Sequence, residues 1–415
     1  MSAPEPEALA GIQRRTVLVL SLAQILGGLA FGATVSVGAI LAVRVSGDEV
    51  FAGLATAAVT LGTALIAWPL SALARRRGRR LSLAAGMFTA LVGVILVIVA
   101  TALGAFWLLL LAFGLVGAGT AVNLQSRFAA TDLASARTRG RDLSVVVWAT
   151  TIGAVLGPNL VGPGEVLGEA FGMPDLTGPY LFTVAAQILG ITVYLVALRP
   201  DPLLTAQHIA RNVDPSVPVP LARPDQPRVA RYAIFTVAAA HGVMVSVMAM
   251  TPVHLSHQSA SISVIGLTIS LHIAGMYALS PVFGILADRL GRVPTILFGQ
   301  VILASALVTA WLGQDSTVAV TVALVLLGLG WSASTVAGSA LLTEASSTDR
   351  STRRQGISDS TMSLVGGTGA ILAGIVLGQI GYGGLALVVG IAVIATALLS
   401  PLGRIRATEP VLVLP

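Results

Sequence analysis

The sequence Gly284-Ile-Leu-Ala-Asp288-Arg289-Leu-Gly291-Arg292 stands between two long hydrophobic segments. A related stretch, Ser71-Ala-Leu-Ala-Arg75-Arg76-Arg-Gly78-Arg79, follows another hydrophobic segment 213 residues earlier. The glycine and the flanking arginine coincide in the two stretches, which indicates that the chain contains two halves of one design. Arg75 in the first copy stands where the second copy has the acidic Asp288.

Hydrophobic segments long enough to cross a bilayer recur along the chain. Its mean hydropathy is +0.90 and its charged residues make up 10%, whereas a spanning helix needs about 20 mostly apolar residues. The 45 glycines suit helices that approach closely in lipid. The sequence therefore predicts an all-α membrane protein with twelve transmembrane helices, at roughly 16–43, 50–74, 81–103, 105–127, 142–163, 179–199, 231–255, 262–287, 294–313, 317–342, 356–379 and 382–404.

The twelve segments divide into two sets of six. Residues 1–199 are expected to form an N-terminal six-helix bundle, and residues 231–415 a C-terminal one. Residues 200–230 lie between them and are rich in proline. They are expected to be a cytoplasmic linker, a tether without a core of its own.

The basic residues are all arginines, and all but Arg44 fall in segments on one side of the predicted helices. The positive-inside rule then places both termini in the cytoplasm, as in a multi-pass protein of the inner membrane. Arginines in short connections between spans do not suggest nucleic-acid binding, despite the pI near 10.6. The absence of cysteine excludes disulfides and thiolate metal sites. The chain has no H-E-x-x-H motif and no paired intramembrane aspartates, so an enzyme is not expected.

The stretch 284–292 resembles the signature loop of the major facilitator superfamily of transporters. That resemblance covers nearly the whole chain and implies two six-helix bundles around a central cavity that opens alternately to either side. It assigns a gating role to Asp288, Arg289, Gly291 and Arg292. Arg75 departs from the pattern, which leaves in doubt the latch that an acidic residue there would supply.

Four of the five histidines and four of the eight methionines lie between residues 241 and 276. Residues four apart share a helix face, so Met244 pairs with Met248 on one span, and His272 with Met276 on the next. All four are predicted near the membrane midplane. Thioether and imidazole ligands suit copper, whereas the lack of carboxylates disfavours harder ions. Further candidate ligands are His241, Met250 and His254.

A Met-x-x-x-Met pair on span 7 with a His-x-x-x-Met pair on span 8 is similar to the CcoA-like copper importers of this superfamily. The resemblance implies that Met244, Met248, His272 and Met276 bind copper as cargo, that no cofactor is needed, and that transport runs into the cytoplasm. A monomer in the lipid bilayer is expected. The alternative for each pair is ordinary packing, since methionine is a common filler of helix interfaces.

Another motif favours a different function. Gly153-Ala-Val-Leu-Gly157-Pro158 resembles the glycine–proline motif of drug–proton antiporters, which implies efflux of drugs or small organic metabolites; close helix packing explains the same residues. Asn123 is the candidate for cavity lining. No acidic residue or arginine is expected deep inside a span, and Arg127 and Asp359 are expected at span ends.

Overall fold

The computed structural model describes residues 6–47, 51–212, 225–260 and 262–405, and its regular elements are all helical. The first half contains α1 (Pro6–Ser46), α2 (Ala52–Ala102), α3 (Phe106–Ala129), α4 (Arg139–Asn159), α5 (Val161–Ala170) and α6 (Pro179–Ala197). The connection carries α7 (Pro202–Asn212). The second half contains α8 (Pro227–His257), α9 (Ile262–Tyr277), α10 (Ser280–Leu290), α11 (Arg292–Leu312), α12 (Thr317–Glu344), α13 (Thr348–Leu398) and the 3₁₀ turn η2 (Ser400–Gly403).

These helices account for twelve spans in two bundles, which confirms the predicted fold class. Two long helices each make two spans, because α2 folds back at Gly78 (φ 86°) and α13 at Gly381 (φ 72°). Positive φ values of this kind are readily adopted only by glycine. Two other spans are broken: α4 continues as α5, and α9 continues as α10. The breaks were not predicted; Pro281 at the start of α10 lacks the N–H that would continue helix α9.

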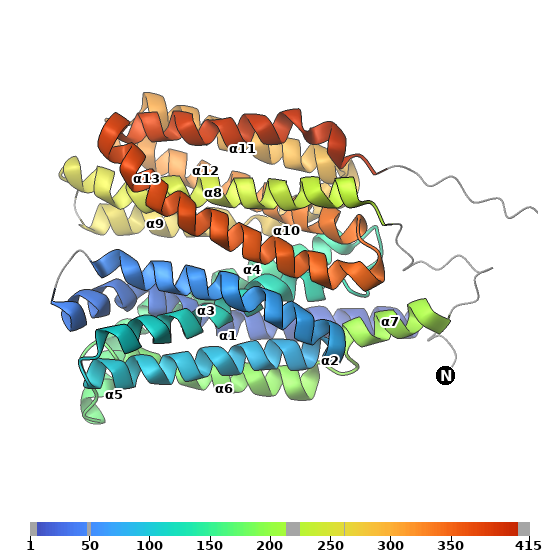
Figure 1. The fold of residues 1–415 in the computed structure, drawn as a ribbon, viewed down its shortest axis with the longest axis horizontal. Helices are drawn as coiled ribbons and strands as arrows, with labels where there is room; N and C mark the ends of the chain where they lie inside the picture. Colours follow the sequence, from blue (N-terminus) through green and yellow to red (C-terminus); the bar gives the residue numbers. More distant parts are fainter. Residues whose placement is uncertain (1–5, 48–50, 213–224, 261, 406–415) are drawn as a thin grey trace, which may run out of the picture.

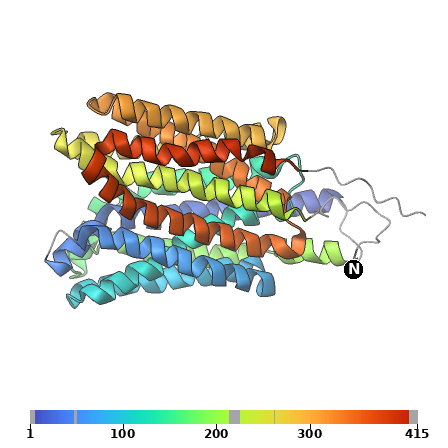
Figure 2. The ribbon, with the colours of Figure 1, turned by 45° about the horizontal axis from the view of Figure 1, so that its top comes forward.

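The two bundles lie side by side with their helices along the long axis of the molecule (Figures 1 and 2). Within the first bundle α2 packs on α3, and α1 on α4 and α6. Within the second, α8 packs on α13, and α12 on α9 and α11. The bundles meet chiefly where α2 lies against α13 and α4 against α10. The end at which α1 begins and α13 finishes is called the terminal end below (Figure 1).

The connection between the bundles is partly ordered. Helix α7 packs Ala206 and Ile209 on Leu133, with Leu9 and Ile12 alongside. The tether interpretation is therefore wrong for residues 202–212, because this segment buries apolar side chains on the first bundle.

Where the connection reaches the second bundle, Asp225 receives hydrogen bonds from Arg354 (2.7 Å and 3.1 Å) and Arg350 (2.9 Å). Burial acts to raise the pKa of Asp225, but the bonds from Arg354 and Ser347 outweigh it and hold that pKa below its usual value. The carboxylate is therefore charged at neutral pH, and it fastens the end of the connection to the start of α13.

The bundles are bonded to each other only from the terminal end to the middle of the molecule, as far as the described residues show. The hydrogen bonds that cross between them join residues 64–144 of the first bundle to residues 280–360 of the second. At the opposite end, the described polar contacts stay within one bundle, as in Arg44–Asp175 and His254–Gln314. The terminal end is therefore the closed one.

Replacing Gly328 by Leu should destabilise the second bundle. A Cβ at Gly328 would lie 2.5 Å from the carbonyl oxygen of His272 and 2.9 Å from the amide nitrogen of Met276, so α9 and α12 touch through their backbones there. Backbone cannot yield as a side-chain end can, and overpacking of this kind costs about 1–3 kcal/mol or more. We expect a lower unfolding temperature in detergent. Gly378→Leu is the matched control, since no atom lies within 4 Å of its Cβ position; equal unfolding temperatures for both variants would refute the contact.

Candidate functional site

The methionines of the predicted copper site lie in the apolar core of the second bundle. Met244 is 2% exposed and Met276 8%, and both belong to one hydrophobic cluster with Leu324, Leu327 and Trp331. Met248 packs against the same cluster from its edge. The prediction that these methionines face a common region is thus consistent with the structure. Their contacts, however, are those of packed apolar side chains.

His272 is fully buried on α9, one turn before Met276. Its Nδ1 lies 2.7 Å from the carbonyl oxygen of Leu324 on α12 and donates to it. Its Nε2 has no hydrogen-bond partner among the described residues. A buried ring nitrogen without a partner is costly, so His272 is the one member of the predicted set with an unused ligand atom.

The outer candidates are held by other contacts. His254 stacks on Tyr382 with ring centroids 4.3 Å apart, and its Nε2 lies 2.7 Å from the carbonyl oxygen of Gln314. Met250 is partly exposed beside Gly374 of α13. Among the described residues, no group of three or more His, Asp or Glu side chains is placed to hold a metal ion.

His241 belongs to a cluster of rings, which we call the ring cluster: His241 on α8, Tyr277 on α9 and Trp331 on α12. The indole Nε1 of Trp331 donates to Nδ1 of His241 at 3.1 Å. Trp331 also meets the ring of Tyr277 edge-on, with centroids 5.9 Å apart. Tyr277 packs in turn against Leu143 and Val147 of α4 in the other bundle. The ring cluster therefore lies where the two bundles face each other.

The ring cluster is partly open. His241 and Tyr277 keep part of their surface exposed although they lie far from the ends of their spans, whereas Trp331 is 4% exposed. Aromatic side chains with polar atoms in such a place suit the recognition of a ring-bearing solute.

A buried ion pair joins the two bundles next to this cluster. Nη2 of Arg127 on α3 lies 2.7 Å from Oδ1 of Asp359 on α13, and both side chains are at most 3% exposed. The other oxygen, Oδ2 of Asp359, has no hydrogen-bond partner among the described residues. Arg127 is close enough to His241 and Tyr277 to act on both electrostatically. The expectation that both charges sit at span ends is wrong in its consequence, because they are enclosed between the bundles.

Sequence reasoning missed this pair because its members are 232 residues apart. The usable signal was a cationic and an anionic residue on spans 4 and 11. Both bundles bury one of these spans at their interface.

Comparison with known proteins gives the family. The model of the Major Facilitator Superfamily matches residues 20–259 and 232–411. The chain belongs to the major facilitator superfamily. It is 37% identical to the uncharacterized MFS-type transporter YdeG of Bacillus subtilis over 93% of this chain and 91% of that protein. It is 29% identical to the riboflavin transporter RfnT of Brucella anthropi over 84% of this chain and 85% of that one.

The structure supports the same family at the level of fold. The human organic anion transporter MFSD10 superposes with a TM-score of 0.72 and 16% identity, over 94% of this chain and 99% of that one. The chain is thus a multi-pass membrane transporter, because this superfamily consists of transporters. The relatives named here are not described as copper importers, so the resemblance to CcoA-like proteins stays a prediction.

The superfamily signature loop lies at the closed terminal end. The carboxylate of Asp288 accepts from the backbone N–H groups of Gly140 (2.9 Å) and Arg141 (2.8 Å), which open helix α4 of the other bundle. A carboxylate at a helix N-terminus satisfies free N–H groups and suits the helix dipole. Arg292 donates to Asp288, and to the carbonyl oxygen of Ala136 at 2.8 Å. Asp288 and Arg292 thus hold the bundles together, as a gating role requires.

The rest of the loop serves geometry. Gly291 has φ 100° and joins α10 to α11. Arg289 is exposed, and the structure gives it no contact that supports its predicted role.

In the first-half copy of the loop, Arg75 has two like charges near it, Arg76 and Arg353. The contact between bundles is made instead by Arg79, whose Nη2 donates to Oε1 of Gln355 at 2.5 Å. Arg79 is itself held by Asp132 at 2.8 Å. The doubtful latch of the first half is therefore replaced by a hydrogen bond from the conserved position of the loop's last arginine relative to Arg292.

The glycines of span 5 make close helix contacts. Gly153 meets Gly28 of α1, where a Cβ on Gly28 would lie 3.0 Å from the Cα of Gly153. Gly157 is buried, and the side chain of Pro158 lies outside the described part of the chain. Asn123 donates to the hydroxyl of Thr150 at 3.2 Å. For Gly153 and Asn123 the contacts lie within the first bundle, so they favour packing over the predicted gating and cavity-lining roles.

Proposed function

We propose that this transporter carries a small organic solute with a planar ring, and that the ring cluster and Arg127 bind it. The observation that supports this most is the placement of His241, Tyr277 and Trp331 between the bundles, beside the buried guanidinium of Arg127. The ring faces would stack on the solute, while His241 and Arg127 would meet its polar groups. The riboflavin transporter among the relatives carries a solute of this chemical class.

The cycle we propose is alternating access in the inner membrane by a monomer with both termini in the cytoplasm. In that orientation the closed terminal end faces the cytoplasm, and the solute enters from the opposite side. Binding would have to weaken the contacts of Arg127, Asp288 and Arg79 across the bundles, so that the terminal end opens. Import and export follow from the same cycle run in opposite directions.

Copper import is the second candidate, and it rests on His272. The unpartnered Nε2 of this residue lies on the same helix as Met276, within reach of the core that holds Met244 and Met248. Copper would then be the transported substrate, bound by soft neutral ligands. The packed state of the methionines requires that the side chains rearrange to admit an ion. That rearrangement makes this the weaker candidate.

Replacing Trp331 by Leu should weaken solute binding about tenfold, because an aromatic pair contributes about 0.5–1.5 kcal/mol beyond its area. The binding assay is quenching of tryptophan fluorescence in the purified protein by riboflavin and a panel of planar organic solutes. Trp331→Phe keeps a ring and should lose most of the quenching signal while retaining affinity measured by dialysis. Trp107→Phe, at an exposed position on α3, is the control and should change neither. Equal affinity in wild type and Trp331→Leu would refute the site.

A further inference from the structure

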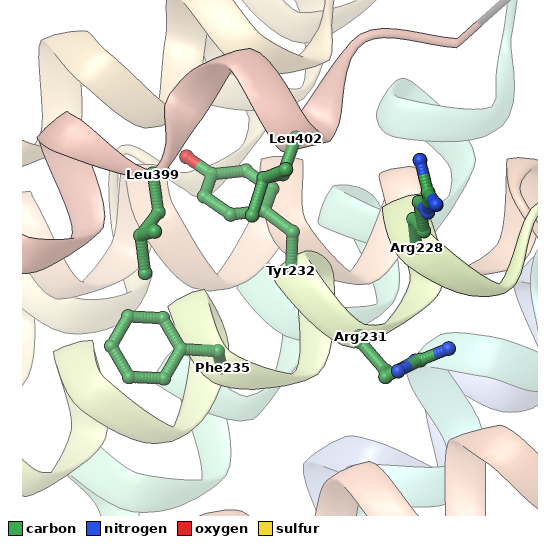
Figure 3. Close-up of a pocket in the computed structure, with 6 residues that line it drawn as sticks. All are labelled: Arg228, Arg231, Tyr232, Phe235, Leu399 and Leu402. Carbon is green, nitrogen blue, oxygen red and sulfur yellow. The ribbon is translucent and has the colours of Figure 1, made fainter.

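A hollow of about 340 Å³ opens on the outside of the second bundle, where α8 begins and α13 ends (Figure 3). It is lined by Arg228, Arg231, Tyr232, Phe235, Leu399 and Leu402. Figure 3 shows the two arginines on one side of the hollow and Phe235 with Leu399 on the other. The hollow therefore has a cationic side and an apolar side.

The four lining residues of α8 are spaced by three, one and three positions, so they share one helix face. Tyr232 forms the floor. Its hydroxyl donates to the carbonyl oxygen of Thr396 at 3.2 Å, and its ring lies under Gly403, where a Cβ would come within 2.6 Å of it. The floor is thus a fixed part of the fold, and the apolar side remains exposed: Phe235 38%, Leu399 40% and Leu402 50%.

The two arginines are not neutralised within the described part of the chain. Neither takes part in an ion pair there, and Arg231 donates only to the carbonyl oxygen of Pro227 in its own helical turn. Other arginines of the same end are paired with carboxylates, among them Arg79, Arg127, Arg292, Arg350 and Arg354. Two free guanidinium groups beside exposed apolar side chains call for an anionic, amphipathic ligand.

The position of the hollow fits a lipid. Pro227 begins an apolar span that runs to Leu255, so Arg228 and Arg231 lie at the level of the lipid headgroups and Phe235 lies deeper. Guanidinium groups bind phosphate through several hydrogen bonds. We propose that this hollow binds one anionic phospholipid, with its phosphate on Arg228 and Arg231 and the start of an acyl chain along Phe235, Leu399 and Leu402. An anionic lipid is favoured over a zwitterionic one, since no carboxylate lines the hollow to receive an ammonium group.

The test is native mass spectrometry of the purified full-length protein titrated with phosphatidylglycerol or phosphatidylcholine. We expect one phosphatidylglycerol to bind more tightly than phosphatidylcholine. An arginine near an anionic lipid surface contributes about 1 kcal/mol, or about fivefold in affinity. The double variant Arg228→Gln, Arg231→Gln should therefore weaken that binding about 25-fold. The control Arg76→Gln, Arg77→Gln removes two exposed arginines from the first bundle and should leave it unchanged.

A second variant tests the apolar side. Phe235→Ser should weaken binding of a long-chain phosphatidylglycerol but not of a short-chain one, because only the long chain reaches this residue. Three results would overturn the proposal: equal binding of both headgroups, equal losses in the test and control double variants, or equal protection against unfolding by inorganic phosphate alone. Tighter lipid binding after removal of residues 406–415, with no effect of the arginine variant, would instead assign the hollow to the chain's own C-terminal segment.

Discussion

Asp359→Asn should open the terminal end and abolish transport. The side chain of Asp359 is fully buried and neutralises Arg127 across the bundles at 2.7 Å. Removing one member of a buried pair leaves the other charge uncompensated, at a cost of about 3–5 kcal/mol. Arg127 escapes that cost only when the bundles separate and water reaches it. The closed state should therefore lose population by on the order of 100-fold relative to the open one.

The reporter for this change is one cysteine in a chain that has none. Ser71 is 1% exposed and lies against Gly356 of the other bundle. In a Ser71→Cys background, Asp359→Asn should speed the reaction with a membrane-impermeant maleimide applied to the terminal end. Asp349→Asn removes an exposed carboxylate from the same helix and is the control. Equal labelling rates in the two variants would show that the ion pair does not hold the bundles together.

The double variant Arg127→Gln, Asp359→Asn separates folding from transport. It leaves no buried charge, and replacing a buried pair by neutral groups is often tolerated. We expect the labelling rate to return toward that of the parent protein, while transport stays lost because the positive charge beside the ring cluster is gone. Recovery of transport would assign the pair to stability alone.

Gly284→Leu should trap the protein with its terminal end open. The backbone of α10 touches that of α4 here: a Cβ on Gly284 would lie 2.5 Å from the carbonyl oxygen of Gly140, and against the side chain of Ser144. A leucine can be accommodated only if the two bundles move apart. Transport should fall at least 100-fold, since a cycle without the closed state cannot return.

The unfolding temperature should change little in Gly284→Leu, because the contact lies between the bundles and each bundle keeps its core. Gly27→Leu, with no atom within 4 Å of its Cβ position, should transport normally. A normal rate in Gly284→Leu, or a collapse of its unfolding temperature, would show that this contact is not a moving interface.

The repeat of the signature loop predicted the fold, and the structure shows how its two copies diverged. Asp288 binds the N–H group of Gly140, and Arg75 stands 213 residues before Asp288. Arg353 stands 213 residues after Gly140, so the divergence placed an arginine at both positions of the first-half contact. The sequence predicted that the acidic latch would be missing. It did not predict that Arg79 and Gln355 would replace it, because that pair comes from distant helices.

The site was less predictable than the fold. Helical spacing correctly placed Met244 and Met248 toward one region, but a thioether packs in a core as readily as it binds a metal. The ring cluster depends on Trp331, 90 residues after its partner His241, and no spacing rule links them. Hydropathy assigned Arg127 to the end of a span, because it averages over residues and does not register a partner on another helix.

The measurement that tests the account most directly is uptake into proteoliposomes of radiolabelled riboflavin and, in parallel, of radioactive copper. The variants are Trp331→Leu and Met244→Leu at matched protein content. We predict uptake of the organic solute by wild type and by Met244→Leu, at least a tenfold loss in Trp331→Leu, and no copper uptake. Copper uptake by wild type that is lost in Met244→Leu, with no riboflavin uptake, would contradict the account and establish the copper site.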